Sequence, residues 1–202
     1  MKINQLEVGS MQNFTYLLVD DNNKSSILID PSWNTEYIKK LIQQYHIQVK
    51  YIVNTHHHFD HVLANDDMSK TTHAKIIQHK SSSLKHDISV ESGDKIQFGD
   101  CELNVIHTPG HSQDSICLIN DKYIFSGDTI FVGSFGRTDL PGGNAEQLYD
   151  SVFGILANLN DDLIIYPGHN YGSTSTSTIR QEKKTNIIFK CKSKHEFLNM
   201  FK

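Results

Sequence analysis

Residues 56–61 read His-His-His-Phe-Asp-His and concentrate side chains that bind transition metals. One residue separates His56 from His58, and in extended backbone this spacing places both imidazoles on the same side of the chain. Asp60 and His61 follow closely and can reach a neighbouring point. Imidazole and carboxylate groups are ligands that zinc and other borderline ions prefer. The segment therefore predicts a metal site.

Three further candidate ligands each follow a predicted strand. His111 comes after Thr-Pro-Gly, Asp128 after Ser-Gly, and His169 after Tyr-Pro-Gly. A rigid sheet can aim side chains that lie just beyond its strand ends. A solitary buried histidine is usually a satisfied core residue, but three such positions together with 56–61 favour one shared metal centre.

The candidate ligands divide into two sets that share one carboxylate. The first set has three histidines and the bridging carboxylate: His56, His58, His111 and Asp128. The second has the same carboxylate, another carboxylate and two histidines: Asp128, Asp60, His61 and His169. An open position for a shared water or hydroxide remains, which distinguishes a catalytic metal site from a closed structural one. We expect two divalent metal ions, with zinc favoured over iron or manganese.

The chain around these residues alternates strands and helices in two similar halves. The first half has predicted strands at 3–8, 14–20, 25–29 and 49–53 and a helix at 35–45. The second half has predicted strands at 74–78, 96–98, 102–107, 115–119, 123–125 and 163–166 and a helix at 145–159. This order predicts two packed sheets with helices outside, in one domain over 1–202 whose residues 173–202 form a C-terminal extension.

Composition narrows the classes of function. Hydrophobic residues make up 38% and charged residues 21% of the chain, as in folded globular proteins. The net charge of -4 offers no polycationic surface for nucleic acid. We find no signal-peptide pattern and no apolar run of about 18 residues that would predict a membrane span. Three widely spaced cysteines without a CxxC pair fit a reducing compartment, so we expect a cytoplasmic location.

The remaining histidines are not predicted to bind metal. His57 lies in the ligand loop, but we interpret it as a residue that is not itself a ligand. His107 ends a strand four residues before His111 and is a candidate for orienting a ligand. Five others lie in polar surroundings and are predicted to be on the surface: His46, His73, His79, His86 and His195.

The motifs at 55–61, 108–111, 127–128 and 168–169 resemble the metallo-β-lactamase superfamily in order and spacing over roughly residues 1–172. The resemblance implies an α+β fold, an αββα sandwich of two mixed β-sheets flanked by helices. It also implies that the metals lie at one edge, between the two sheets.

Within the superfamily, the chain is similar to glyoxalase II (hydroxyacylglutathione hydrolase). The similarity rests on Thr-His-His-His-Phe-Asp-His and on the segments 127–131, 136–137 and 168–171. It implies a thioesterase that acts on a small-molecule ester or thioester, with Arg137 and Tyr171 near the substrate. Residues 170–202 form a segment that is shorter than the helical domain that supplies the glutathione site in that family. Asn170 also stands at the position where that family usually has Glu. Glutathione specificity is therefore not implied.

Two alternatives stay open. The segments 136–139, 149–152 and 177–182 also resemble persulfide dioxygenases, which hold one iron through two histidines and an aspartate. Those ligands would be His56, His111 and Asp128, an arrangement that suits dioxygen chemistry. Phe59 favours the hydrolases, because the dioxygenases tend to have a small residue there. The second alternative is a metal-binding protein without catalytic activity.

The leading hypothesis is a metallo-hydrolase. Two ions would lower the pKa of a shared water toward ~7, so that a bridging hydroxide attacks the thioester carbon. Asp60 would orient the hydroxide and Asp128 would bridge the ions, so both are predicted to be catalytic. A thiolate needs little protonation on leaving, which accommodates the lack of an obvious general acid.

Overall fold

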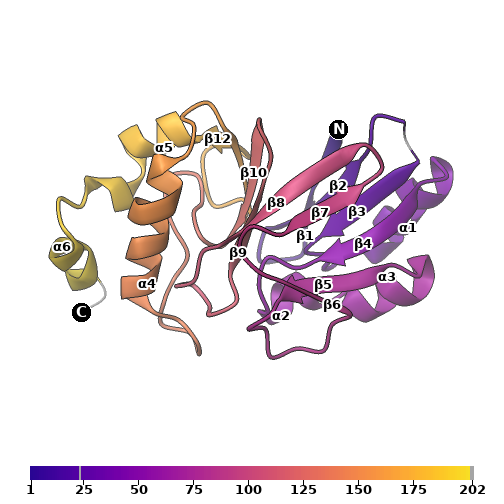
Figure 1. Ribbon diagram of the computed structural model, residues 1–202, viewed down its shortest axis with the longest axis horizontal. Helices are drawn as coiled ribbons and strands as arrows, with labels where there is room; N and C mark the ends of the chain where they lie inside the picture. The colour runs from indigo at the N-terminus through magenta and orange to yellow at the C-terminus, as the bar shows by residue number, and fades with distance from the viewer. Residues whose placement is uncertain (23, 201–202) are drawn as a thin grey trace.

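Two six-stranded sheets face one another in the computed structural model, which describes residues 1–22 and 24–200. Helices cover the outer face of each sheet, α1–α3 on one side of the molecule and α4–α6 on the other (Figure 1). The predicted αββα sandwich is therefore confirmed. Residue 23, and residues 201–202 of the predicted C-terminal extension, lie outside the described part.

The first sheet follows chain order. Its strands are β1 (Lys2–Val8), β2 (Asn13–Val19), β3 (Ser25–Ile29), β4 (Gln48–Val53), β5 (Lys75–His79) and β6 (Ile88–Val90). Strands β1 to β3 are antiparallel, whereas β3 to β6 are parallel. Parallel neighbours need crossover connections: the one from β3 to β4 contains helix α1 (Thr35–Gln44), and the one from β4 to β5 contains helices α2 (Phe59–Val62) and α3 (Asn65–Thr72). The connection from β5 to β6 is a loop.

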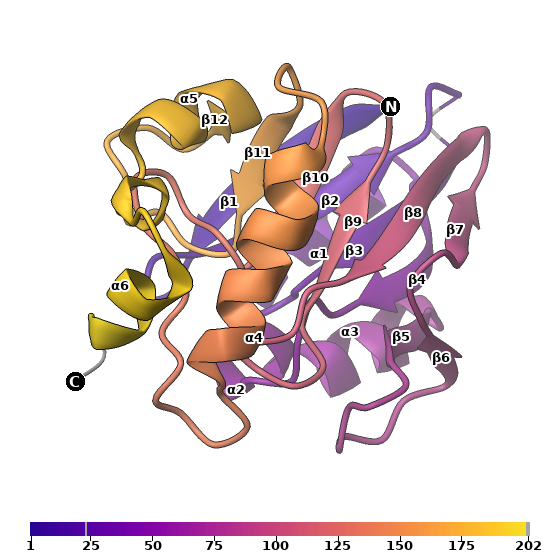
Figure 2. The same cartoon turned by 60° about the vertical axis from the view of Figure 1, so that its left-hand side comes forward.

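The second sheet contains β7 (Lys95–Phe98), β8 (Cys101–His107), β9 (Ile116–Ile119), β10 (Tyr123–Gly127), β11 (Ile164–Pro167) and β12 (Ser177–Thr178). Only β10 and β11 pair in parallel among its described strands. Their crossover is α4 (Ala145–Tyr149), which continues through a π-helical segment, η1 (Asp150–Ile155), and a 3-10 turn, η2 (Leu156–Asn158), and lies across this sheet (Figure 2). Helix α5 (Ile179–Thr185), a 3-10 turn, η3 (Ile187–Lys190), and α6 (Lys194–Asn199) complete the chain.

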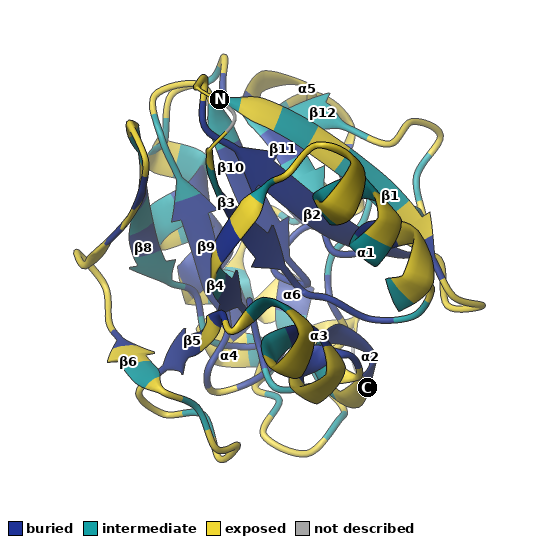
Figure 3. Cartoon of the chain, turned by 90° about the vertical axis from the view of Figure 1, so that its right-hand side faces the viewer, coloured by how far each residue is buried: buried dark blue, intermediate teal, exposed yellow. Residues whose placement is uncertain are grey.

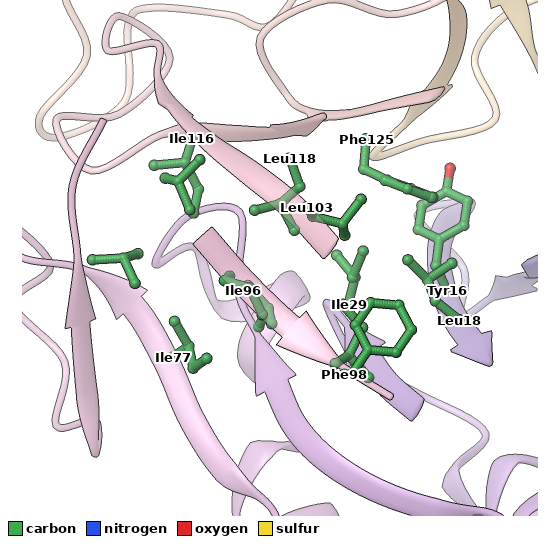
Figure 4. Close-up of a cluster of buried hydrophobic side chains, with 14 of the residues drawn as sticks. Tyr16, Leu18, Ile29, Ile77, Ile96, Phe98, Leu103, Ile116, Leu118 and Phe125 are labelled. Atoms are coloured by element: carbon green, nitrogen blue, oxygen red, sulfur yellow. The ribbon is translucent and has the colours of Figure 1, made fainter. Parts of the chain in front are cut away.

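Strand β2 shows how the sequence produces the layers. All of its residues are buried, and alternate side chains enter different cores because a strand has a period of two. Tyr16 and Leu18 face the other sheet, whereas Leu17 and Val19 face the helices. Figure 4 shows the core between the sheets, where Tyr16 and Leu18 approach Phe125 from the second sheet.

The helices over the first sheet are amphipathic. In α1, Ile38 is fully buried, while Tyr37 remains 55% exposed. Figure 3 shows the exposed outer faces of α1 and α3 in front of the buried strands β2, β3 and β4. None of the helices in residues 1–22 and 24–200 has the length and apolar character needed to cross a bilayer.

Candidate metal centre

One edge of the sandwich gathers the carboxyl ends of three strands. Within three residues of their ends, β4, β10 and β11 are followed by His56, Asp128 and His169, respectively. The two sheets are tied together here, because the Phe14 N–H donates a hydrogen bond of 2.7 Å to the Gly168 carbonyl. The edge therefore brings candidate ligands from both halves of the sequence to one place.

All seven predicted ligands lie in this place. Their nitrogen and oxygen atoms form three overlapping groups, in each of which the atoms lie within 4.8 Å of one another: His56, His58 and His111; His56, His61 and Asp128; and Asp60, His61 and His169. The Asp128 carboxylate lies centrally, 3.4 Å from His111 Nε2, 3.4 Å from His61 Nε2 and 3.3 Å from His169 Nε2. The geometry thus allows the bridging position that the sequence analysis predicts for Asp128.

The donor atoms of this cluster are arranged to bind a cation rather than to form hydrogen bonds with one another. His58 Nδ1 lies 2.8 Å from His111 Nε2, and His61 Nε2 lies 3.2 Å from His169 Nε2. Facing lone pairs repel unless a proton or a metal ion lies between them. His56 Nε2 and Asp128 Oδ1 are also buried without a hydrogen-bond partner, which is unusual for a polar atom. These atoms would hold divalent metal ions.

Backbone carbonyls orient two of the imidazoles. The Nδ1 atoms of His111 and His169 lie 2.7 Å from the Arg137 carbonyl and 2.8 Å from the Met11 carbonyl. A carbonyl only accepts hydrogen bonds, so each Nδ1 carries the proton and each Nε2 lone pair faces the cluster. This is the usual arrangement behind a metal-bound histidine.

Asp30, which was not predicted from the sequence, orients another part of the cluster. This buried residue has a φ of 48° at the end of β3. Its carboxylate accepts hydrogen bonds from the Thr55 N–H at 2.7 Å and the Thr55 hydroxyl at 2.6 Å, and lies 3.1 Å from His61 Nδ1. An acidic residue between a strand and Pro31 is the signal that could have indicated it.

Asn13 plays a similar part for Asp60. Its side-chain amide donates hydrogen bonds to Asp60 Oδ2 at 2.9 Å and to the Asp60 carbonyl at 3.1 Å. Asn13 is the first residue of β2 and is buried, so the position of the Asp60 carboxylate also depends on the first sheet.

Burial and neighbouring carboxylates shift the pKa values of the imidazoles in this cluster in opposite directions. Burial lowers the pKa of His56, and lowers that of His58 to about 4. Burial opposes ionisation of Asp128 as well, but His61 and His169 hold its pKa well below the usual range. Burial also opposes the charged form of His61, yet Asp128 and Asp30 raise its pKa. Two carboxylates thus favour positive charge at this point, which a metal ion would supply.

Two glycines allow the close packing. A Cβ atom on Gly168 would lie 2.2 Å from Asp128 Oδ1. Gly127 has a φ of 49°, and a Cβ atom there would lie 2.5 Å from the Thr55 hydroxyl oxygen. The Gly-Asp and Gly-His pairs of the sequence therefore reflect how tightly β10 and β11 approach the ligand loop.

A cavity of about 630 Å³ opens onto the cluster, and both predicted substrate residues line it. The Tyr171 ring stacks on His169, with ring centres 4.6 Å apart and an angle of 12° between planes. Arg137 is engaged elsewhere: its Nε and Nη2 donate hydrogen bonds of 2.6 Å to the two carboxylate oxygens of Asp139. The structure brings both residues to the cavity, and their role toward a substrate stays a prediction.

Three other histidines can now be placed. His57 lies outside the three ligand groups; its Nδ1 is 2.6 Å from Asp114 Oδ1, and this contact raises its pKa.

The prediction that His79 is on the surface is wrong, because only 3% of it is exposed. It stacks on His107, with ring centres 3.9 Å apart and an angle of 12°. His107 thus packs against another imidazole of the neighbouring sheet, a contact that a local sequence pattern does not encode.

Comparisons with known proteins identify the family to which the chain is similar. A family model described as the metallo-beta-lactamase superfamily matches residues 8–87 and 80–169. A probable polyketide biosynthesis zinc-dependent hydrolase, PksB of Bacillus subtilis, is 28% identical over 92% of this chain and 85% of its own. The cytoplasmic hydroxyacylglutathione hydrolase of Saccharomyces cerevisiae is 35% identical over 84% of this chain and 68% of its own.

A different activity is found among equally similar proteins. The human mitochondrial persulfide dioxygenase ETHE1 is 34% identical over 86% of this chain and 70% of its own. The crystal structure of ETHE1 from Myxococcus xanthus superposes with a TM-score of 0.93, at 31% identity over 99% of this chain and 89% of that one. The relatives thus include metal-dependent hydrolases and a dioxygenase.

Proposed function

Because the chain belongs to the metallo-beta-lactamase superfamily, we propose that it is a thioester hydrolase with two divalent metal ions in its active site. The observation that carries this proposal is the convergence of seven donor side chains in overlapping groups around Asp128. A single ion of low coordination number would leave several of these buried donors without a partner. The proposed cytoplasmic location fits the three cysteines, which are all free thiols in the described residues.

Each ligand would have a defined role. His56, His58 and His111 would hold one ion, Asp60, His61 and His169 would hold the other, and Asp128 would bridge them. Metal ions bound in this way lower the pKa of a water and polarise a carbonyl oxygen. Zinc is favoured by the imidazole-rich ligands, with iron or manganese as alternatives.

The protein's own residues would position the reactants. Asn13 donates a hydrogen bond to the Asp60 carboxylate and would keep that group in place to orient the attacking water. The Tyr171 ring lies flat on His169 at the cavity and would form a wall for the substrate. A thiolate leaves without a strong acid, so none of these residues needs to donate a proton to the leaving group. The substrate would be a small-molecule thioester or ester.

A direct experiment would load the purified protein with zinc, iron or manganese and follow thioester hydrolysis by thiol release without oxygen. We expect hydrolysis to require metal and to continue in anaerobic buffer. Treatment with a chelator should remove the activity, and adding metal back should restore it. Metal-loaded protein that releases no thiol from any thioester would contradict the proposal.

Persulfide dioxygenation is the second candidate, supported by the TM-score of 0.93 with ETHE1 over 99% of this chain. His56, His111 and Asp128 would then hold one iron, as two histidines and a carboxylate do in many oxygen-activating enzymes. Oxygen consumption by the iron-loaded protein with glutathione persulfide, in the absence of thioesterase activity, would favour this candidate over the hydrolase.

A further inference from the structure

The cavity beside the metal ligands has an apolar wall. At about 630 Å³ it falls within the range of small-molecule sites, which run from about 300 to 1,000 Å³. Its described lining includes six apolar residues: Met11, Phe59, Phe131, Phe135, Leu140 and Pro141. Phe59 is 63% exposed, so its ring is accessible to a ligand in the cavity. This wall favours an apolar group close to the reacting carbonyl.

The charges of the cavity lining also favour a substrate without negative charge. Arg137 is the only Lys or Arg among its described lining residues, and the Asp139 carboxylate already binds its guanidinium through two hydrogen bonds. That contact lowers the pKa of Asp139 to about 2, and at neutral pH the carboxylate offsets the charge of the guanidinium. A negatively charged substrate would have to compete with Asp139 for Arg137.

The neighbouring groove has no Lys or Arg among its described lining residues. It shares Ser134 and Tyr171 with the cavity and is otherwise lined by hydroxyl, amide and small side chains together with Glu182. Glu182 is buried and accepts hydrogen bonds from the Gly133 N–H at 2.8 Å and the Asn186 side-chain amide at 2.7 Å. The groove suits an uncharged group that forms hydrogen bonds.

We propose that the substrate is an acyl thioester with an apolar acyl chain and an uncharged thiol half, rather than an acylglutathione. This inference rests on the proposed hydrolase function and specifies its substrate class. The acyl chain would occupy the apolar cavity, and the thiol half would extend along the groove past Tyr171. Glutathione carries carboxylates, and the one Lys or Arg side chain among the described lining residues of the cavity and the groove, Arg137, is already paired with Asp139.

The test compares thioesters of one uncharged thiol, N-acetylcysteamine, with acetyl, butanoyl, hexanoyl and octanoyl groups. Each buried methylene should raise kcat/KM by about fourfold until the cavity is full. An S-hydroxyacylglutathione should react more slowly than the butanoyl compound. Binding of the unreactive S-butyl and S-octyl thioethers, measured by calorimetry on metal-free protein, should show the same order.

Variants locate the effect in this cavity. Leu140→Asn should reduce the preference for octanoyl over acetyl, whereas Leu84→Asn changes an exposed leucine outside the cavity and should leave that ratio unaltered. Asp139→Asn frees Arg137 and should raise the relative rate with the glutathione ester by up to about fivefold, the value of an exposed ion pair.

The outcomes separate this inference from the proposed function. A preference for the glutathione ester, with rates that do not depend on acyl length, would overturn the inference and leave the hydrolase standing. No hydrolysis of any thioester by the metal-loaded protein would overturn the proposed function, and the inference with it.

Discussion

Asp128 is the side chain on which the proposed metal centre most depends. It follows β10, lies within 3.4 Å of His61 and His111, and contacts His169 from the second half of the chain. An amide at this position keeps the shape but loses the negative charge that would bridge two ions.

We predict that Asp128→Asn lowers kcat/KM by more than about 100-fold, since changes to residues behind a ligand already cost about 10–100-fold. The metal content, measured by mass spectrometry, should fall below that of the wild type. Asp162→Asn, which alters an exposed carboxylate far from the cluster, serves as the control. An Asp128→Asn protein with normal metal content and rate would disprove the bridging role.

Asp30 should act on the metal through Thr55 and His61. Asp30→Asn keeps one acceptor oxygen but weakens the contact with His61 Nδ1, so we predict a loss of metal affinity of about 10–100-fold. Competition with a chromogenic chelator measures this affinity. If saturating metal restores the rate, Asp30 is a positioning residue; unchanged affinity would exclude that role.

At the residue scale, the sequence allowed prediction of the ligand candidates because their types and positions after strands carry the signal. It did not allow prediction of Asp30, Asn13 or the partner of His57. These residues are ordinary in their local context, and their roles arise only from contacts made when the sheets pack. The same reason explains the wrong prediction for His79.

At the element scale, β5 and β8 belong to different sheets and meet through His79 and His107. The Ser81 N–H donates a hydrogen bond of 3.2 Å to His79 Nδ1, which requires an unprotonated nitrogen there. Burial, with His107 beside it, lowers the pKa of His79 to about 4. The contact between these strands therefore depends on a neutral ring.

This pairing predicts a specific pH dependence. A histidine has a pKa of about 6.5 in the unfolded chain, so the unfolded state takes up the proton first as the pH falls. The contribution of a neutral His79 is complete above about pH 6.5 and is lost between there and about pH 4.

The free energy of unfolding, measured by urea titration of metal-free protein, should fall by on the order of 1 kcal/mol more in the wild type than in His79→Gln between pH 7 and pH 5. His195→Gln, at an exposed position, should follow the wild type. Parallel curves for the wild type and His79→Gln would contradict the prediction.

Most elements could be predicted from their hydrophobic patterns, to within one or two residues for strands such as β3 and β8. The short elements could not. β6 has three residues and β12 has two, and they exist because neighbouring strands pair with them. Helix α2 holds Asp60 and His61 in a segment that was expected to be a loop, since four residues show no helical period.

At the scale of the whole molecule, the two sheets share one hydrophobic core. Phe98 from β7 is fully buried and lies beside Ile29 from β3 in Figure 4. Because ligands come from both sheets, the packing that stabilises the fold also brings the donor atoms together.

We predict that Phe98→Ala lowers the free energy of unfolding by about 3–5 kcal/mol, as large-to-small substitutions in cores do. Metal loss and sheet unfolding should occur in one transition, followed by circular dichroism and metal release. Met200→Ala, at an exposed position, is the control. Metal release well before unfolding in the variant would show that the core and the site are independent.

The number of metal ions per active chain tests the central claim most directly. Protein loaded with zinc, freed of loosely bound ions and assayed for thioester hydrolysis should contain two ions per chain, located by anomalous diffraction on either side of Asp128. One iron held by His56, His111 and Asp128, in a protein that consumes oxygen and hydrolyses no thioester, would contradict the account.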